Sequence, residues 1–162
     1  HPASVALILE RAGLDDENLL AAALLHDVVE DTSCTLADVA RNFPPAVVEL
    51  VDALSEKKLD EAGGKRPWED RKRDHLEVLR TGPFGARAIA LADKLHNIES
   101  LLWDLEQDGP GVWERFNALP DRLLTYHRAV VSACNHGEPE LRPLVDACNS
   151  AITRLEAMAP KK

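Results

Sequence analysis

Residues 21–32 read AAALLHDVVEDT, and this stretch combines a strongly apolar helix with an unusual group of charges. From Leu19 to Val29, apolar residues surround any helix drawn through the segment, which predicts a helix buried in the protein interior. Its last turn carries four ionisable side chains: His26, Asp27, Glu30 and Asp31. A helix C-terminus is the negative end of the helix dipole, so carboxylates clustered there repel it and one another. Burying such a cluster is costly unless a positive group lies among them, and the sequence therefore predicts a bound cation.

The spacing of these four residues predicts two adjacent polar stripes. Residues four apart share a helix face, so His26 aligns with Glu30, and Asp27 aligns with Asp31. His26 and Asp27 offer a nitrogen and an oxygen ligand for a metal ion. Glu30 and Asp31, one turn further on, are placed to handle a water molecule bound to that ion. The residues alone leave a second interpretation open, in which an exposed helix end carries ordinary solvated acids.

The composition indicates one soluble globular domain. The chain has 162 residues, of which 45% are hydrophobic and 29% charged, and it has no apolar run of the ~20 residues that a membrane span needs. Neither a signal peptide nor a CxxC pair is present, which favours a cytoplasmic protein with reduced thiols over a disulfide or structural zinc protein. The net charge of −9 argues against nucleic acid as a partner, but a local pocket can still bind a small anion.

Apolar residues recur with helical periodicity along the chain, and no segment alternates between apolar and polar residues as a strand does. We therefore expect a compact all-α bundle. Thr35 and Asp38 have the spacing of a capping box, and prolines open several of the other helices. A loop is expected at residues 57–66 and a short helical turn at "VWERF", 112–116. The expected helices cover residues 2 to 12, 15 or 16 to 31, 35 to 43, 45 to 54, 67 to about 81, 84 to 105, 120 to 133 and 139 to 158.

A second polar group lies in "ALADKLHN", residues 90–97. Asp93 and Asn97 are four residues apart and lie opposite the apolar stripe of their helix, which is formed by Leu91, Leu95, Ile98, Leu102 and Leu105. Taken alone, this pair is simply expected to face water. His1 is a weaker signal still, being a single terminal histidine before a proline.

A run of basic residues lies between residues 57 and 73. Seven basic side chains stand there against the four acidic ones Asp60, Glu61, Glu69 and Asp70; the basic ones are Lys57, Lys58, Lys65, Arg66, Arg71, Lys72 and Arg73. Such a run is ordinarily a solvated helix face. The alternative is a surface that meets an anionic ligand.

Three motifs together resemble a known family. "HP" at 1–2, "LLHDVVEDT" at 24–32 and "LADKLHN" at 91–97 have the order and spacing of the hydrolase domain of the RelA/SpoT alarmone enzymes, within the HD-domain phosphohydrolase superfamily. The chain is most similar to the small stand-alone alarmone hydrolases and their metazoan SpoT-homologue relatives. The likeness extends from His1 to Leu105 and includes "PWEDRKR" at 67–73.

The resemblance implies a manganese ion held by His1, His26, Asp27 and Asp93. It also implies that Glu30 and Asp31 position and deprotonate the attacking water. Asn97 matches a position that contacts the nucleotide, Lys94 is placed to touch phosphate, and His96 has no ligand role in the family pattern. Mixed imidazole and carboxylate donors suit a divalent ion, although donor type alone does not choose manganese from iron, cobalt or zinc. We further expect the basic stretch from Lys65 to Arg73, including Arg71 and Arg73, to meet a diphosphate group.

The implied activity is Mn²⁺-dependent hydrolysis of the 3′-diphosphate of (p)ppGpp, a small-molecule nucleotide, to GDP or GTP and pyrophosphate. One alternative is an HD-domain phosphatase acting on another nucleotide, such as NADPH. The other is a nucleotide-sensing module without catalysis, which the intact Glu30–Asp31 pair disfavours because a sensor needs no water-activating group.

The chain departs from the family pattern at two places. It begins at the first implied ligand, whereas the family has a preceding helix with basic residues. We therefore expect the HD domain at residues 1–162 to lack that helix and His1 to be weakly anchored. Second, Trp68 stands where some relatives carry a lysine. This leaves core packing and stacking on a base as alternatives for Trp68.

Overall fold

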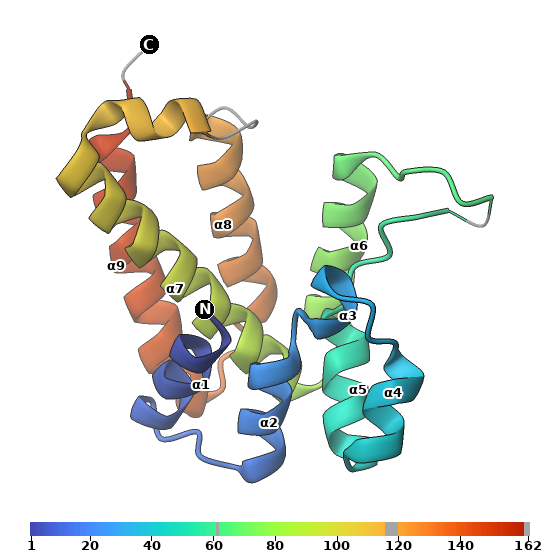
Figure 1. Ribbon diagram of the computed structural model, residues 1–162. Coiled ribbons are helices and arrows are strands. Elements are labelled where there is room, and N and C mark those ends of the chain that lie inside the picture. Colours follow the sequence, from blue (N-terminus) through green and yellow to red (C-terminus); the bar gives the residue numbers. More distant parts are fainter. Residues whose placement is uncertain (61, 116–119, 161–162) are drawn as a thin grey trace.

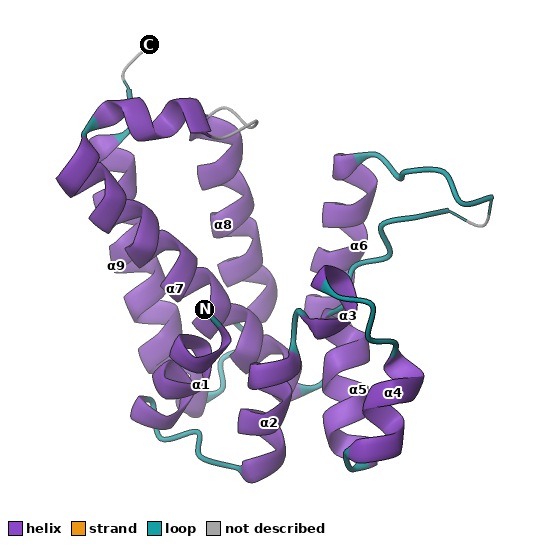
Figure 2. Cartoon of the chain, in the orientation of Figure 1, coloured by secondary structure: helices purple, strands orange, loops and turns teal. Residues whose placement is uncertain are grey.

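The computed structural model describes residues 1–60, 62–115 and 120–160, and helices account for most of them (Figures 1 and 2). Among the described residues the only β-type pairing is an isolated bridge between Leu59 and Lys65. The all-α prediction is therefore confirmed. The helices are α1 (Pro2–Arg11), α2 (Glu17–Leu25), α3 (Val28–Asp31), α4 (Leu36–Asn42), α5 (Pro45–Leu54), α6 (Trp68–Thr81), α7 (Phe84–Asp108), η1 (Pro110–Arg115), α8 (Pro120–Cys134), η2 (Pro139–Leu141) and α9 (Arg142–Met158).

Most helix boundaries follow from local sequence signals. The capping box at α4 forms as expected, because the Thr35 hydroxyl accepts from the Asp38 amide while the Asp38 carboxylate accepts from the Thr35 amide. Helix α7 continues three residues beyond the expected Leu105. It ends at Asp108, and the following Gly109 has a φ of 76°, a conformation that glycine adopts without strain. The predicted turn at residues 112–116 forms as η1, and Phe116 lies outside the described residues.

Helix α7 is the central element of the core. It packs against α1, α9, α8 and α5, and it runs diagonally across the bundle in Figure 1. Its buried side chains include most of the predicted apolar stripe, with Leu95 only half-buried. Helices α6 and α8 also pack together, so the chain places the α5–α6 region beside the C-terminal helices. No helix among the described residues is both long and apolar enough to cross a membrane.

The structure corrects the prediction of one continuous buried helix ending at Asp31. Helix α2 ends at Leu25, and α3 restarts at Val28 after a turn at residues 26–27. The His26 side chain explains the break, because its Nδ1 lies 2.7 Å from the Ala23 carbonyl oxygen. In an unbroken helix that carbonyl would accept from the Asp27 amide. The i, i+4 alignment of His26 with Glu30 is therefore not formed by a regular helix.

Two further expectations need correction. Helix α2 is not buried on every side: Leu19, Ala22 and Ala23 are buried, but Leu24 is 50% exposed because no described element covers that face. The last helix does not start at Pro139, where the chain first forms the 3₁₀ turn η2. Pro143 lacks an amide hydrogen, so it cannot donate to the Pro139 carbonyl, which accepts instead from the Arg142 amide.

Candidate metal centre and active site

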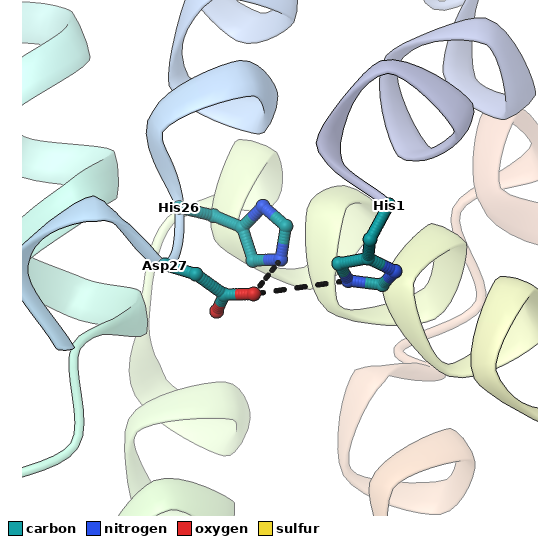
Figure 3. Close-up of side chains that lie close together, drawn as sticks. All are labelled: His1, His26 and Asp27. Atoms are coloured by element: carbon teal, nitrogen blue, oxygen red, sulfur yellow. Dashed lines mark ion pairs between the residues drawn. The ribbon is translucent and has the colours of Figure 1, made fainter. Parts of the chain in front are cut away.

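The break between α2 and α3 turns His26 and Asp27 toward the first residue of the chain and toward α7 (Figure 3). Four side-chain atoms then form a closed ring. His26 Nε2 lies 3.1 Å from Asp27 Oδ2 and 3.9 Å from Asp93 Oδ1. His1 Nε2 lies 2.9 Å from Asp93 Oδ1 and 3.8 Å from Asp27 Oδ2. The structure therefore brings together all four residues that the sequence proposed as metal ligands.

The spacing of these atoms fits a bound divalent ion. Donors held at about 2.1 Å from such an ion lie about 3.0 Å apart in an octahedral shell and about 3.4 Å apart in a tetrahedral one. The four observed separations span that range. Independently of Asp93, the donor atoms of His1, His26 and Asp27 all lie within 4.8 Å of one another, as a shared metal ion requires.

The hydrogen bonding of His26 prepares its Nε2 atom for a cation. The His26 side chain is only 5% exposed, and its Nδ1 donates to the Ala23 carbonyl. That bond leaves the Nε2 lone pair directed at the ring of donors, where it makes no hydrogen bond of normal geometry. Burial lowers the pKa of His26, but the Asp27 carboxylate, the Ala23 carbonyl and Asp93 outweigh it, and the net pKa is raised. The site thus attracts positive charge, either a proton or a metal ion.

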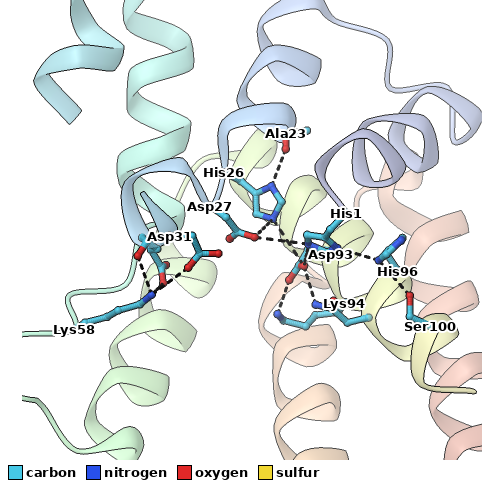
Figure 4. Close-up of polar contacts among 12 residues, drawn as sticks. His1, Ala23, His26, Asp27, Asp31, Lys58, Asp93, Lys94, His96 and Ser100 are labelled. Atoms are coloured by element: carbon cyan, nitrogen blue, oxygen red, sulfur yellow. Dashed lines mark hydrogen bonds and ion pairs between the residues drawn. The ribbon is translucent and has the colours of Figure 1, made fainter. Parts of the chain in front are cut away.

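His1 is held in place by His96, which the sequence gave no ligand role. His1 is the N-cap residue of α1, and its Nδ1 lies 2.9 Å from His96 Nδ1. Ser100 Oγ lies 3.5 Å from the same His96 nitrogen (Figure 4). When His1 Nε2 faces the ring of donors as a lone pair, His1 Nδ1 carries the hydrogen and donates it to His96. His96 therefore orients the His1 imidazole, and the expected weak anchoring of His1 is not what the structure shows.

Asp93 is held ionised by its neighbours on α7. Its carboxylate pairs with the Lys94 ammonium through Oδ2, and Oδ1 accepts from Asn97 Nδ2 at 2.8 Å. Burial raises the pKa of Asp93, but Lys94, His26 and Asn97 outweigh burial and lower the net pKa. In the same way burial lowers the pKa of Lys94, while Asp93 reverses that effect and raises it. Asp93 and Asn97 were expected from spacing alone to face water; Asn97 is exposed as expected, whereas the Asp93 side chain is only 14% exposed, and both line a cavity.

That cavity, of about 290 Å³, lies around the candidate metal centre. Glu30 lines it, with a side chain only 16% exposed, whereas the Asp31 side chain is 68% exposed and lies at the surface. The residues lining it are His1, His26, Asp27, Glu30, Leu54, Glu56, Lys72, Ile89, Ala90, Asp93, Lys94 and Asn97. The lining thus includes four carboxylates and two ammonium groups.

The basic run is divided between different surroundings. Arg71 Nη1 lies 2.8 Å from Glu56 Oε2, and Lys72 binds the other oxygen of the same carboxylate. Arg73 is 69% exposed and pairs with Asp70 on its own helix. Of these basic residues only Lys72 lines the cavity of the candidate metal centre. The sequence located the basic run at residues 57–73, of which Arg71, Lys72 and Arg73 lie on α6, but it could not tell which side chain faces the site.

Trp68 lies outside that cavity. It lines a groove between α6 and α8, with its ring edge-on to Tyr126 at a centroid distance of 5.7 Å. The Arg122 guanidinium lies 4.1 Å above the Trp68 ring. Trp68 packs partly against the core, and this agrees with the simpler of its two interpretations.

Two further histidines, His75 and His127, lie close enough to Lys94 to feel its charge. The sequence did not indicate them, because neither belongs to a motif. Burial, assisted by the nearby Lys94 charge, lowers the pKa of His75 to about 4 and that of His127 to about 4. His127 is 5% exposed, and neither His75 Nε2 nor His127 Nδ1 has a hydrogen-bond partner. Both rings are therefore held neutral, which keeps additional positive charge away from Lys94.

This arrangement predicts an acid-sensitive fold. Histidines in the unfolded chain take up protons below pH 6.5, and the two buried rings do so only near pH 4. The free energy of unfolding of the metal-free protein should fall between pH 6.5 and 4, by about 3 kcal/mol for each histidine. His26 does not interfere, because its raised pKa changes stability only above pH 6.5. Urea unfolding across this range checks the prediction. A double variant, His75→Leu with His127→Leu, should give a flatter profile, and an unchanged slope would contradict it.

The family model for the HD domain matches residues 1–120, which include every residue of the donor ring. The chain belongs to the HD-domain family. Mouse guanosine-3′,5′-bis(diphosphate) 3′-pyrophosphohydrolase MESH1 is 41% identical to this HD-domain chain over 102 residues, which are 62% of this chain and 54% of MESH1. The chain spans about half the length of the curated relatives it matches. These relatives confirm the likeness to alarmone hydrolases inferred from the three motifs.

Two solved structures share the fold of this HD domain. The crystal structure of lmo0812 from Listeria monocytogenes EGD-e matches with a TM-score of 0.82 and 35% identity, over 94% of this chain and 96% of that one. A second structure is described as a metazoan ortholog of SpoT that hydrolyzes ppGpp and plays a role in starvation responses. It matches with a TM-score of 0.69 and 29% identity, over 93% of this chain and 78% of that one. The helical bundle is therefore of the HD type.

Proposed function

We propose that this HD-domain protein is a Mn²⁺-dependent hydrolase that removes the 3′-diphosphate of (p)ppGpp, giving GDP or GTP and pyrophosphate. The observation that carries the proposal is the ring of four donor atoms beside Glu30, in one cavity with Lys72 and Lys94. The relatives named as ppGpp 3′-pyrophosphohydrolases support this choice of substrate.

The charges of the cavity explain why a metal ion belongs there. Its four carboxylates outnumber its two ammonium groups, so the cavity on its own repels a nucleotide diphosphate. His1, His26, Asp27 and Asp93 would hold the ion, which offsets this excess. A bound divalent ion also lowers the pKa of a water molecule and stabilises negative charge on a phosphoryl group.

The protein side chains then divide the remaining tasks. Glu30 and Asp31 hold the attacking water and accept its proton, with the Glu30 carboxylate on the cavity wall. Lys94 is fixed by Asp93, and Lys72 by Glu56, so both ammonium groups are pre-positioned for phosphate oxygens. Asn97 lies at the same opening and is assigned to the nucleotide. Arg71 and Arg73 lie further out and contribute long-range attraction.

The second candidate is phosphatase activity on another nucleotide such as NADPH, at the same metal centre. A 3′-diphosphate carries more negative charge toward Lys72 and Lys94 than a 2′-phosphate does, and this difference favours ppGpp. A nucleotide sensor without catalysis is disfavoured by the placement of Glu30, which lies against the cavity but is not one of the four donors.

Product analysis with Mn²⁺ supplied tests this choice. We expect pyrophosphate from ppGpp, at a higher kcat/KM than any release of phosphate from NADPH or simple 5′-nucleotides. Chromatography of the products separates the two reactions. Orthophosphate from NADPH exceeding pyrophosphate from ppGpp would favour the second candidate. Metal binding without cleavage of any of these nucleotides would favour the sensor.

A further inference from the structure

The catalytic pair sits on a helix that has little packing of its own. Helix α3 is a single turn, Val28–Asp31, and none of its residues is buried. Of its residues Val29 alone is packed against the core, so apolar contacts contribute little to fixing the carboxylates of Glu30 and Asp31 to the accuracy that catalysis needs. Some other part of the chain must hold them.

The segment that follows α5 supplies that support. The Glu56 amide donates to Glu30 Oε1 at 2.7 Å. Lys58 Nζ lies 3.0 Å from Glu30 Oε2, donates to the Glu30 carbonyl at 3.2 Å, and lies 3.5 Å from Asp31 Oδ1. One ammonium group thus contacts both catalytic carboxylates and the carbonyl between them (Figure 4 shows Lys58 beside Asp31). Both oxygens of Glu30 are held by this segment.

The supporting segment is itself anchored to α6. The Glu56 side chain is only 9% exposed and is held by Arg71 and Lys72. The Arg66 amide donates to the Lys58 carbonyl at 3.1 Å, and the Arg66 guanidinium donates to the Lys57 carbonyl at 3.3 Å. The position of the Lys58 backbone is therefore set by contacts independent of α3.

We propose that Lys58 is a positioning residue for the catalytic pair, holding Glu30 and Asp31 in register with the metal centre through its bridge to both. Lys58 does not line the cavity, so it acts through these carboxylates and not on the substrate. The inference rests on the proposed function for its catalytic consequence, but its structural content does not depend on the identity of the substrate.

The test compares Lys58→Met with Lys57→Met, which removes the same charge one position away, where the ammonium has no contact with α3 in the described residues. We expect Lys58→Met to lower kcat for ppGpp about 10- to 100-fold with KM and metal content unchanged. Lys57→Met should keep both constants, and Lys58→Arg should recover most of kcat. A kcat within about twofold of the wild type, or a loss confined to KM, would overturn the proposal.

A second readout needs no turnover. Hydrogen exchange of the Glu56 amide, followed by NMR, reports its bond to Glu30 directly. We expect this exchange to be faster in Lys58→Met than in Lys57→Met, because Glu30 has lost its second anchor. If the wild-type protein cleaves no nucleotide, the proposed function fails while this comparison still decides the role of Lys58. Equal exchange in the two variants would refute it.

Discussion

Replacing His26, Asp27 or Asp93 by alanine should reduce the bound metal from about one ion per chain to nearly none. Each substitution removes one of the four atoms of the donor ring. A site left with three or fewer protein donors binds a divalent ion far more weakly, and the remaining carboxylates lose the charge that offsets their repulsion. Turnover of ppGpp should fall with the metal content.

Asp93 provides the most informative of these variants, because it lies on α7, 66 residues beyond Asp27 in the sequence. Removing its carboxylate also leaves the Lys94 ammonium, whose side chain is only 15% exposed, without its partner, which destabilises the fold. Asp93→Asn avoids much of that effect by keeping an oxygen acceptor, and it should still lose metal. Asp104→Ala removes an exposed carboxylate from the same helix and serves as the control.

Elemental analysis of the purified variants measures the result, with circular dichroism to verify folding. If His26→Ala, Asp27→Ala and Asp93→Asn all retained the metal content of the wild type, the donor ring would be no metal site. The cluster would then be a set of partly solvated acids paired with histidines, which is the alternative that the sequence left open.

The sequence was sufficient to predict the fold class because helix patterns are local, whereas the set of four donors followed from the resemblance of three motifs to a family and stays a prediction. Proline starts, the capping box at Thr35 and the glycine after α7 mark helix ends through covalent geometry and hydrogen bonding within a few residues. The four donor residues lie in three short motifs that are far apart in the sequence. Packing of α1 and α2 against α7 brings these motifs together in space.

Most of the features that the sequence did not predict depend on contacts between residues distant in the chain, and one depends on a local competition for a hydrogen bond. The break at His26 arises because its imidazole, and not the Asp27 amide, donates a hydrogen bond to the Ala23 carbonyl. The periodicity of apolar residues gives no indication of this competition. His96 supports His1 across 95 positions of the chain, and the Glu56 amide reaches Glu30 across 26. Arg71 and Lys72 look equivalent in the sequence, yet helical rotation places only Lys72 on the cavity wall.

Glu30→Gln and Asp31→Asn should leave the metal in place while abolishing most of the turnover. Neither residue belongs to the donor ring, so each substitution keeps the four donor atoms and nearly the same side-chain shape. An amide cannot accept the proton of the attacking water, and loss of a general base typically lowers kcat about 10²- to 10⁴-fold. Glu30→Gln should have the larger effect, because Glu30 lines the cavity whereas the Asp31 side chain is 68% exposed.

Kinetics with ppGpp and metal analysis on the same preparations separate the two roles. Glu49→Gln, an exposed glutamate on α5, is the matched control and should keep full activity. A Glu30→Gln protein that lost its metal would make Glu30 a ligand and not a base. A protein carrying both Glu30→Gln and Asp31→Asn that still turned over near the wild-type rate would remove the water-activating role altogether. The attacking water would then be deprotonated without these carboxylates, and the bridge from Lys58 would have no catalytic purpose.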